Sequence, residues 1–291
     1  MPETNEELES LINTTFLGYK YRKANDMLYS TDGVVPLSLI KLYYSGKIKR
    51  LSVNAINKNF IEKYIKNESL LEDVHDIDEV RGLADMYETM NNMDEDDFNI
   101  FSIGTLHKKL YSKCPYPEFG GRLRTNPAHI SGCPVDLYPY DLIFDGLMSL
   151  EEPLDNLKEF ANQIKYKDYS NIKTFIKECM KIKCKLIQIH PFGDGNGRTV
   201  RCFINKLFTM AGIPPVYIKQ NEKEEYKAAM TEALRHRSAD EVDDDSKYDQ
   251  ITNFYLYKIC DSIIELDINK KMREERKQGK YEIKKVKNST R

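Results

Sequence analysis

Apolar side chains recur at the spacing of amphipathic helices along most of the chain. In the segments 172–189 and 196–210, large apolar residues return every three or four positions, with polar residues between them. Pro191 ends the first pattern, and the glycine density of residues 193–197 excludes the interior of a helix. The sequence therefore predicts a loop that joins two helices and opens the second one.

Five further segments carry a helical pattern, which we place at about 57–72, 77–91, 154–165, 222–236 and 248–268. The segment 117–135 differs, because Gly and Pro interrupt short extended pieces there. Such a composition predicts a small β-hairpin.

Composition narrows the class of protein. The chain has 291 residues, 41% hydrophobic, which is enough apolar material for a sizeable core. A net charge of −2 gives the whole molecule no strong bias toward nucleic acid or membrane. The charge is uneven, however, since residues 269–291 carry 10 Lys or Arg against 3 Glu, and we expect this basic tail to be solvated.

The cysteines and the apolar runs point to the compartment. None of the 6 Cys forms a CxxC pair, and Cys179, Cys202 and Cys260 lie in helical patterns as expected of core residues. No charge-free apolar run approaches the roughly 20 residues of a membrane span, and the acidic N-terminus is unlike a secretory signal. We expect a soluble, cytoplasmic protein.

The loop before the second helix has the features of a phosphate site. A helix N-terminus presents unpaired N–H groups, and Gly195, Asn196 and Gly197 allow an anion to approach them. Arg198 and Arg201 lie three positions apart on the first helical turn, so both can reach phosphate oxygens. We interpret this segment as an anion-binding nest with two arginines, although Asn196 could also serve simply as a helix cap.

Two further residues of this loop suggest chemistry rather than binding alone. The carboxylate of Asp194 would be repelled by phosphate unless a divalent cation lay between them, which points to Mg²⁺. His190 ends the preceding helix, and a neutral imidazole there can accept a proton from an attacking hydroxyl. Together these residues predict transfer of a nucleotide from a bound nucleoside triphosphate.

The segment from His190 to Arg201 resembles the motif of the Fic family, filamentation induced by cAMP. The family motif reads His-x-Phe-x-Asp/Glu-Gly-Asn-Gly-Arg-x-x-Arg, and the chain matches every fixed position. The resemblance implies an all-α Fic-type helical bundle with a small β-hairpin flap. It also implies a protein adenylyltransferase that transfers AMP from ATP to a Ser, Thr or Tyr hydroxyl of a target protein, and that also modifies itself.

The resemblance assigns roles and boundaries as well. It makes His190 the base, Asp194 the Mg²⁺ holder, Arg201 the γ-phosphate ligand and Tyr226 a residue near the adenine. The residues that would bind the phosphates are Gly195, Asn196, Gly197 and Arg198. The residues of the flap that would pair with target backbone are Ala128, His129, Ile130, Ser131 and Gly132. The domains implied are an N-terminal helical accessory region at 1–60, a catalytic domain at 61–268 and the basic tail at 269–291.

Many Fic proteins carry an inhibitory helix with the pattern Ser/Thr-x-x-x-Glu-Gly/Asn, and the segment near 57–72 resembles it. Glu72 would be the inhibitory residue that pairs with Arg201 and blocks the γ-phosphate. The chain departs from the pattern at two positions, since Glu68 stands where Ser or Thr is expected and Asp73 replaces Gly or Asn.

Other functions stay open at this point. The same loop could serve a hydrolase that removes AMP from a target, with Glu72 positioning a water. The protein could be the toxin of a toxin–antitoxin pair, or a non-enzymatic module that senses nucleotides; His190 argues against pure binding, because phosphate capture needs no base. ATP and a target protein are the expected partners, nucleic acid and membrane are not, and the sequence leaves a homo-oligomer open.

Overall fold

The computed structural model describes residues 58–130, 135–166, 171–234 and 245–277, together with Ile40. For residues 58, 59, 165, 166 and 267–277 it describes the backbone only. Nearly all of the predicted N-terminal region, the end of the basic tail, and Ser131 and Gly132 of the predicted flap therefore lie outside the described residues.

The described chain is helical. Its α-helices are α3 (Lys58–Leu71), α4 (Ile77–Asn92), α5 (Ser102–Leu110), α6 (Ile143–Met148), α7 (Glu151–Tyr166), α8 (Ile172–Ile189), α9 (Asn196–Met210), α10 (Lys223–Leu234) and α11 (Asp249–Lys277). Short 3-10 turns cover Pro117–Phe119, Tyr140–Leu142, Gln220–Glu222 and Asp245–Tyr248. The described residues contain no strand, only one isolated antiparallel bridge between Leu123 and Phe192.

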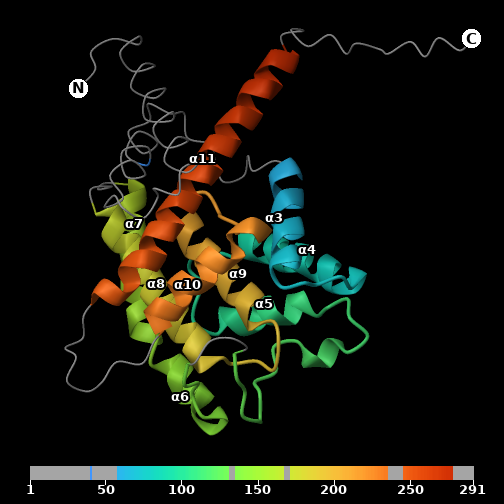
Figure 1. The fold of residues 1–291 in the computed structure, drawn as a ribbon, viewed down its shortest axis with the longest axis vertical. Helices are drawn as coiled ribbons and strands as arrows, with labels where there is room; N and C mark the ends of the chain where they lie inside the picture. Colours follow the sequence, from blue (N-terminus) through green and yellow to red (C-terminus); the bar gives the residue numbers. More distant parts are fainter. Residues whose placement is uncertain (1–39, 41–57, 131–134, 167–170, 235–244, 278–291) are drawn as a thin grey trace, which may run out of the picture.

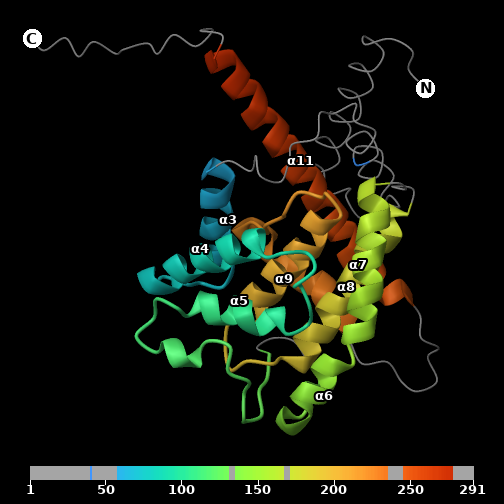
Figure 2. The same cartoon turned by 180° about the vertical axis from the view of Figure 1, so that it is seen from behind.

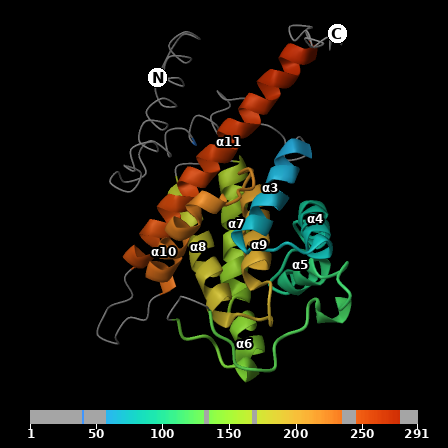
Figure 3. The ribbon, with the colours of Figure 1, turned by 45° about the vertical axis from the view of Figure 1, so that its right-hand side comes forward.

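Helix α9 is the centre of the molecule. It packs against α4, α5, α7 and α8, while α10 and α11 cover α8 from the other side (Figures 1 and 3). Every residue of α9 is buried except Gly197 and Thr209, which are half-buried. Because this central helix carries charged residues as well as apolar ones, its buried charges need partners from the surrounding helices.

Helices α3 and α4 lie beside α9 and α5 and away from α7 (Figure 2). Gly82 of α4 allows the close approach to α5, because a Cβ at this position would lie 1.8 Å from the carbonyl oxygen of Leu110. Asp76 caps α4 and accepts hydrogen bonds from the amides of Asp78 and Glu79 at 2.8 and 3.0 Å. The start of α4 is thereby fixed next to the start of α9.

The helical fold predicted from the sequence is confirmed, and all seven predicted helices are present. Two helices were not predicted: α5 has only nine residues with Gly104 inside them, and α6 has six. Helix α11 continues to Lys277, beyond the predicted helix end at about 268, and the domain boundary placed there stays a prediction. Cys179, Cys202 and Cys260 are buried core residues as expected, and no helix of the described chain is both long and apolar enough to cross a membrane.

Candidate active site

His190 lies where α8 ends. It adopts a left-handed conformation, with φ of 48°, which turns the chain out of the helix and into the loop. Its Nδ1 lies 3.3 Å from the carbonyl oxygen of Ile187, and since a carbonyl only accepts, Nδ1 carries the hydrogen and Nε2 keeps its lone pair. Burial lowers the pKa of His190, so the ring is neutral and can accept a proton at Nε2.

The loop after His190 is braced by Asn196. The Asn196 side chain accepts from the Phe192 amide at 3.0 Å and donates to the Phe192 carbonyl at 2.7 Å, so both of its polar atoms are engaged within the loop. Gly195 has a φ of 70° and opens α9. The side chain of Asn196 thus shapes the loop, and its predicted contact with phosphate would be made by its backbone N–H.

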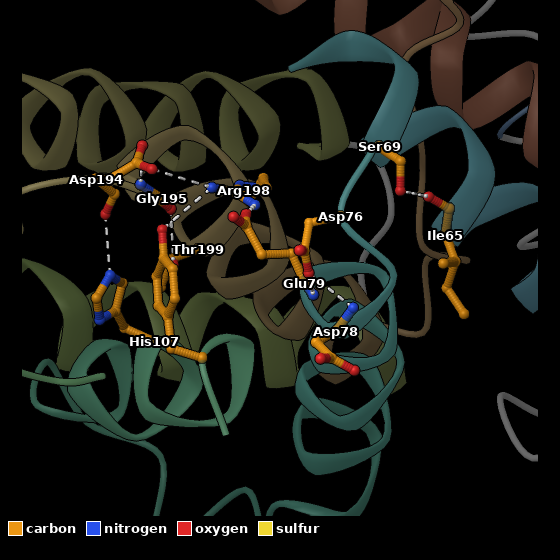
Figure 4. Close-up of polar contacts among 11 residues, drawn as sticks. Ile65, Ser69, Asp76, Asp78, Glu79, His107, Asp194, Gly195, Arg198 and Thr199 are labelled. Carbon is orange, nitrogen blue, oxygen red and sulfur yellow. Dashed lines mark hydrogen bonds and ion pairs between the residues drawn. The ribbon is translucent and has the colours of Figure 1, made fainter. Parts of the chain in front are cut away.

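Arg198 is buried and held by residues of α4 and α5. Its Nη1 forms an ion pair with Glu79 (Figure 4). Its Nη2 lies 3.2 Å from the hydroxyl oxygen of Tyr111. Its Nη2 is also 3.6 Å from a carboxylate oxygen of Asp194. Burial disfavours the charged guanidinium, but Tyr111 and then Glu79 outweigh burial and raise the pKa of Arg198.

Arg201 contacts two carboxylates at once. Its Nε donates to Glu68 at 2.8 Å, and its Nη1 lies 2.7 Å from Glu72. Glu68 is completely buried, whereas the side chain of Glu72 is 38% exposed. A Cβ at Gly197 would lie 2.7 Å from the Glu72 carboxylate and 3.0 Å from Arg201 Nη1, so glycine leaves the space that this ion pair fills.

The two carboxylates on Arg201 differ in their electrostatics. Burial raises the pKa of Glu68 and outweighs the attraction of Arg201. Burial also opposes charge on Glu72, but Arg201 and then Arg198 outweigh it and lower its pKa. Glu72 is thus a stable carboxylate at the edge of the site, from which a competing anion could displace it.

Asp73 explains one departure from the family pattern. It has a φ of 57°, in the left-handed region, and the amide of Val74 donates to the carbonyl of Ser69 at 2.9 Å as the chain leaves α3. This conformation favours glycine and tolerates Asn or Asp. Asp73 therefore meets the backbone requirement of the position at which the family has Gly or Asn.

Asp194 presents its carboxylate to solvent at the mouth of the loop, with a side chain 70% exposed. One oxygen accepts the Gly195 amide at 2.7 Å. The described residues contain no group of three or more His, Cys, Asp or Glu that could hold a metal ion. A single accessible carboxylate beside a phosphate site nevertheless suits Mg²⁺, which takes most of its ligands from phosphates and water.

The segment predicted as a flap packs against the catalytic loop. Leu123 bridges to Phe192, and the Arg124 amide donates to the Pro191 carbonyl at 2.9 Å. The Arg124 guanidinium donates to the carbonyl oxygens of four residues, at 2.5–3.3 Å: Asn126, Tyr138, Ile189 and His190. These contacts tie the segment to the backbone that carries the candidate base.

The hairpin itself does not form in residues 117–130, because the extended piece at Leu123 pairs with the catalytic loop instead of a second arm. Within the predicted target-binding stretch, Ala128 and Ile130 are half-buried and His129 is exposed. Their role in target binding stays a prediction.

Tyr226 lies on α10 and is buried. Its hydroxyl is 2.6 Å from Nζ of Lys183, a completely buried lysine of α8, and its ring centroid is 5.7 Å from that of Phe254. The structure thus fixes the orientation of the Tyr226 ring.

Four residues of the site were not singled out from the sequence: Glu68, Glu79, His107 and Arg124. Glu68 was noted only as a departure from a pattern, and its spacing of four from Glu72, one helical turn, was the available signal. Glu79 and His107 come from α4 and α5, far from the motif in sequence, and nothing local marks them. Arg124 lies within the segment 117–135 predicted as a hairpin, but its contacts depend on the tertiary fold.

Comparison with known proteins finds similarity to one family and one fold. Residues 97–208 match the Fic/DOC family. The fold agrees, since the chain superposes on Fic-1 from C. elegans with a TM-score of 0.61 at 18% identity, covering 86% of this chain and 76% of that one. A Fic-domain-containing signalling protein from Bacteroides thetaiotaomicron gives 0.62 at 14%, covering 80% and 96%.

Two relatives have a higher sequence identity to the chain than these solved structures, and both are named protein adenylyltransferase Fic. The protein adenylyltransferase Fic of Nematostella vectensis is 28% identical over 163 residues, which is 53% of this chain and 34% of the relative. That of Drosophila melanogaster is 31% identical over 144 residues, 50% of this chain and 26% of the relative. The chain thus spans about a third or less of the length of these relatives.

Proposed function

We propose that this protein transfers AMP from ATP to a hydroxyl group of a target protein. The observation that carries the proposal is the neutral His190, whose Nε2 lone pair is free beside a glycine-rich helix N-terminus with two buried arginines. The similarity to proteins named protein adenylyltransferase supports the same activity.

The reaction follows from these positions. The target oxygen forms a bond to the α-phosphorus of ATP while the bond from that phosphorus to the oxygen bridging to the β-phosphate breaks. Nε2 of His190 accepts the hydroxyl proton, and pyrophosphate leaves with the electron pair. Backbone N–H groups at Gly195–Gly197 and the arginines Arg198 and Arg201 would bind the phosphate chain.

Mg²⁺ and adenine complete the proposed complex. Asp194 would hold Mg²⁺, which neutralises phosphate charge when bound. Tyr226 would contact the adenine ring, with its own ring oriented by Lys183. The half-buried and exposed residues Ala128, His129 and Ile130 would face the target backbone.

We further propose that the site is autoinhibited. Glu72 occupies Nη1 of Arg201 at 2.7 Å, where the γ-phosphate would otherwise bind. ATP must therefore displace Glu72 before it binds in the transfer-competent position. Removal of Glu72 is expected to raise both ATP affinity and AMP transfer.

The proposal is tested by incubating the full chain with ATP and Mg²⁺, alone and with a cell lysate, followed by mass spectrometry. We expect a mass gain of one AMP on Ser, Thr or Tyr, increased by Glu72→Gly and abolished by His190→Ala. ATP binding should largely survive His190→Ala. Transfer that persists without His190 would refute the mechanism, and loss of AMP from a modified target without transfer would favour the hydrolase.

A further inference from the structure

His107 of α5 joins two parts of the site that are far apart in sequence. It is completely buried. Its Nδ1 accepts the amide hydrogen of Gly121 at 2.7 Å, and Gly121 belongs to the segment 117–135 that was predicted as the flap. Its Nε2 lies 2.9 Å from the carbonyl oxygen of Asp194 (Figure 4). Since Nδ1 accepts and the Asp194 carbonyl also accepts, the hydrogen lies on Nε2, and a neutral ring satisfies both contacts.

The ring is also fixed by stacking on Phe192, with centroids 3.8 Å apart and planes 13° from parallel. Burial lowers the pKa of His107 to about 4, outweighing the contact with Asp194, so the neutral form persists at physiological pH. His107 thus touches the flap segment, the aromatic residue of the loop and the backbone of Asp194 at the same time.

The carboxylate of Asp194 lies largely in solvent and contacts the Gly195 amide at 2.7 Å, Arg198 at 3.6 Å and the side chain of Tyr111, whereas His107 contacts its backbone carbonyl. The backbone at Gly121 requires glycine, since φ is 79° and a Cβ there would lie 3.0 Å from the Gly104 carbonyl, and its amide donates to His107. Few side chains offer an acceptor and a donor on opposite edges of one rigid ring.

We propose that His107 is a positioning residue that holds Asp194 and the flap segment at a fixed separation, so that metal-bound nucleotide and target backbone meet in register. This inference rests on the proposed function, because it takes Asp194 as the cation ligand and the flap as the target-binding strand. It assigns to His107 no contact with substrate.

Two isosteric variants separate the two contacts. His107→Asn places an amide oxygen where Nδ1 lies and keeps the Gly121 contact, but the shorter side chain cannot reach Asp194. His107→Gln places an amide nitrogen near Nε2 and keeps the Asp194 contact, but it loses the acceptor for Gly121. Leu106→Val, on the same helix and equally buried, is the control for a loss of packing that touches neither contact.

Two readouts are measured in the full chain carrying Glu72→Gln. The first is Mn²⁺ affinity in the presence of an ATP analogue with a non-cleavable α,β-methylene bridge, followed by electron paramagnetic resonance. The second is hydrogen–deuterium exchange of the peptide covering 117–125. His107→Asn should weaken Mn²⁺ binding by about tenfold, the scale for residues that orient a metal ligand, with exchange unchanged. His107→Gln should accelerate exchange with Mn²⁺ binding nearly unchanged.

Equal loss of both properties in the two variants, or no change in either, overturns the inference. If the parent protein binds no Mn²⁺ with the analogue, the proposed function fails and the inference falls with it. If the His107 variants do not fold, a measurement on the protein without these variants tests the inference. In ¹⁵N NMR of the histidine rings, His107 should show the Nε2–H tautomer. Its Nε2 signal should shift when Mg²⁺ and the analogue bind. An unshifted signal also refutes the inference.

Discussion

Replacement of Glu72 by Gln tests the proposed competition between this carboxylate and the γ-phosphate. The variant keeps the shape of the side chain and removes its charge from Arg201 Nη1, 2.7 Å away. If ATP must displace the carboxylate, ATP binding should become tighter by the free energy of the lost ion pair. The second carboxylate on Arg201, from Glu68, stays in place and limits the gain.

The free energy of the ion pair between Glu72 and Arg201 depends on how exposed the Glu72 side chain is. The Glu72 side chain is 38% exposed, so its ion pair lies between an exposed pair, about 0.2–1 kcal/mol, and a buried charge-assisted hydrogen bond, about 1.5–3 kcal/mol. We take about 1 kcal/mol, which corresponds to about fivefold in Kd. The free energy of unfolding should fall by no more than about the same 1 kcal/mol.

The measurement is isothermal titration with the α,β-methylene ATP analogue and Mg²⁺, together with urea unfolding of both proteins. Glu88→Gln is the matched control, because Glu88 is an exposed residue of α4 and undergoes the same change of charge away from Arg201. Equal affinity in wild type and Glu72→Gln, or the same increase in the Glu88 control, would refute the competition.

Three further predictions concern the buried groups. Glu68→Gln should lower the free energy of unfolding by about 3 kcal/mol, because it removes the charge of the fully buried partner of Arg201 while keeping an acceptor oxygen; a loss below about 1 kcal/mol in urea would mean that Glu68 carries no charge. Burial lowers the pKa of His190, so AMP transfer should fall on acidification with a midpoint below the ordinary histidine value of about 6.5, and a midpoint above it would contradict the neutral base. Gly82→Ala should destabilise the fold by about 1–3 kcal/mol, since its Cβ meets the Leu110 carbonyl. Its control, Gly104→Ala, has open space around the new Cβ and should stabilise the fold by up to about 1 kcal/mol. Equal changes in the melting temperature of the two variants would refute the close contact at Gly82.

Local patterns accounted for the helices and for the catalytic loop. The segments 172–189 and 196–210 have their observed bounds, because Pro191 and the glycines mark the boundary between them in the sequence itself. The loop residues from His190 to Arg201 are neighbours in the chain, so their convergence required no knowledge of the tertiary fold.

Long-range contacts could not be predicted in this way. The approach of Glu79 to Arg198 depends on the packing of α4 against α9, with the start of α4 fixed by the Asp76 cap. The hairpin prediction did not hold for residues 117–130, because the pairing partner of Leu123 lies in the catalytic loop rather than in the adjacent sequence.

Three of the four carboxylates that contact Arg198 and Arg201 in the described chain come from α3, the turn after it, and α4, and the fourth is Asp194 of the loop before α9. In the proposed complex, the phosphates of the nucleotide and these carboxylates bind the same two arginines, so nucleotide binding and the anchoring of α3 and α4 are linked equilibria. Because linkage is reciprocal, any change that strengthens the contact of α3 and α4 with α9 lowers the affinity for ATP by the same factor. Bound ATP in turn weakens that contact. The backbone protection of α3 should therefore fall as ATP concentration rises, which makes this helix a reporter of nucleotide occupancy.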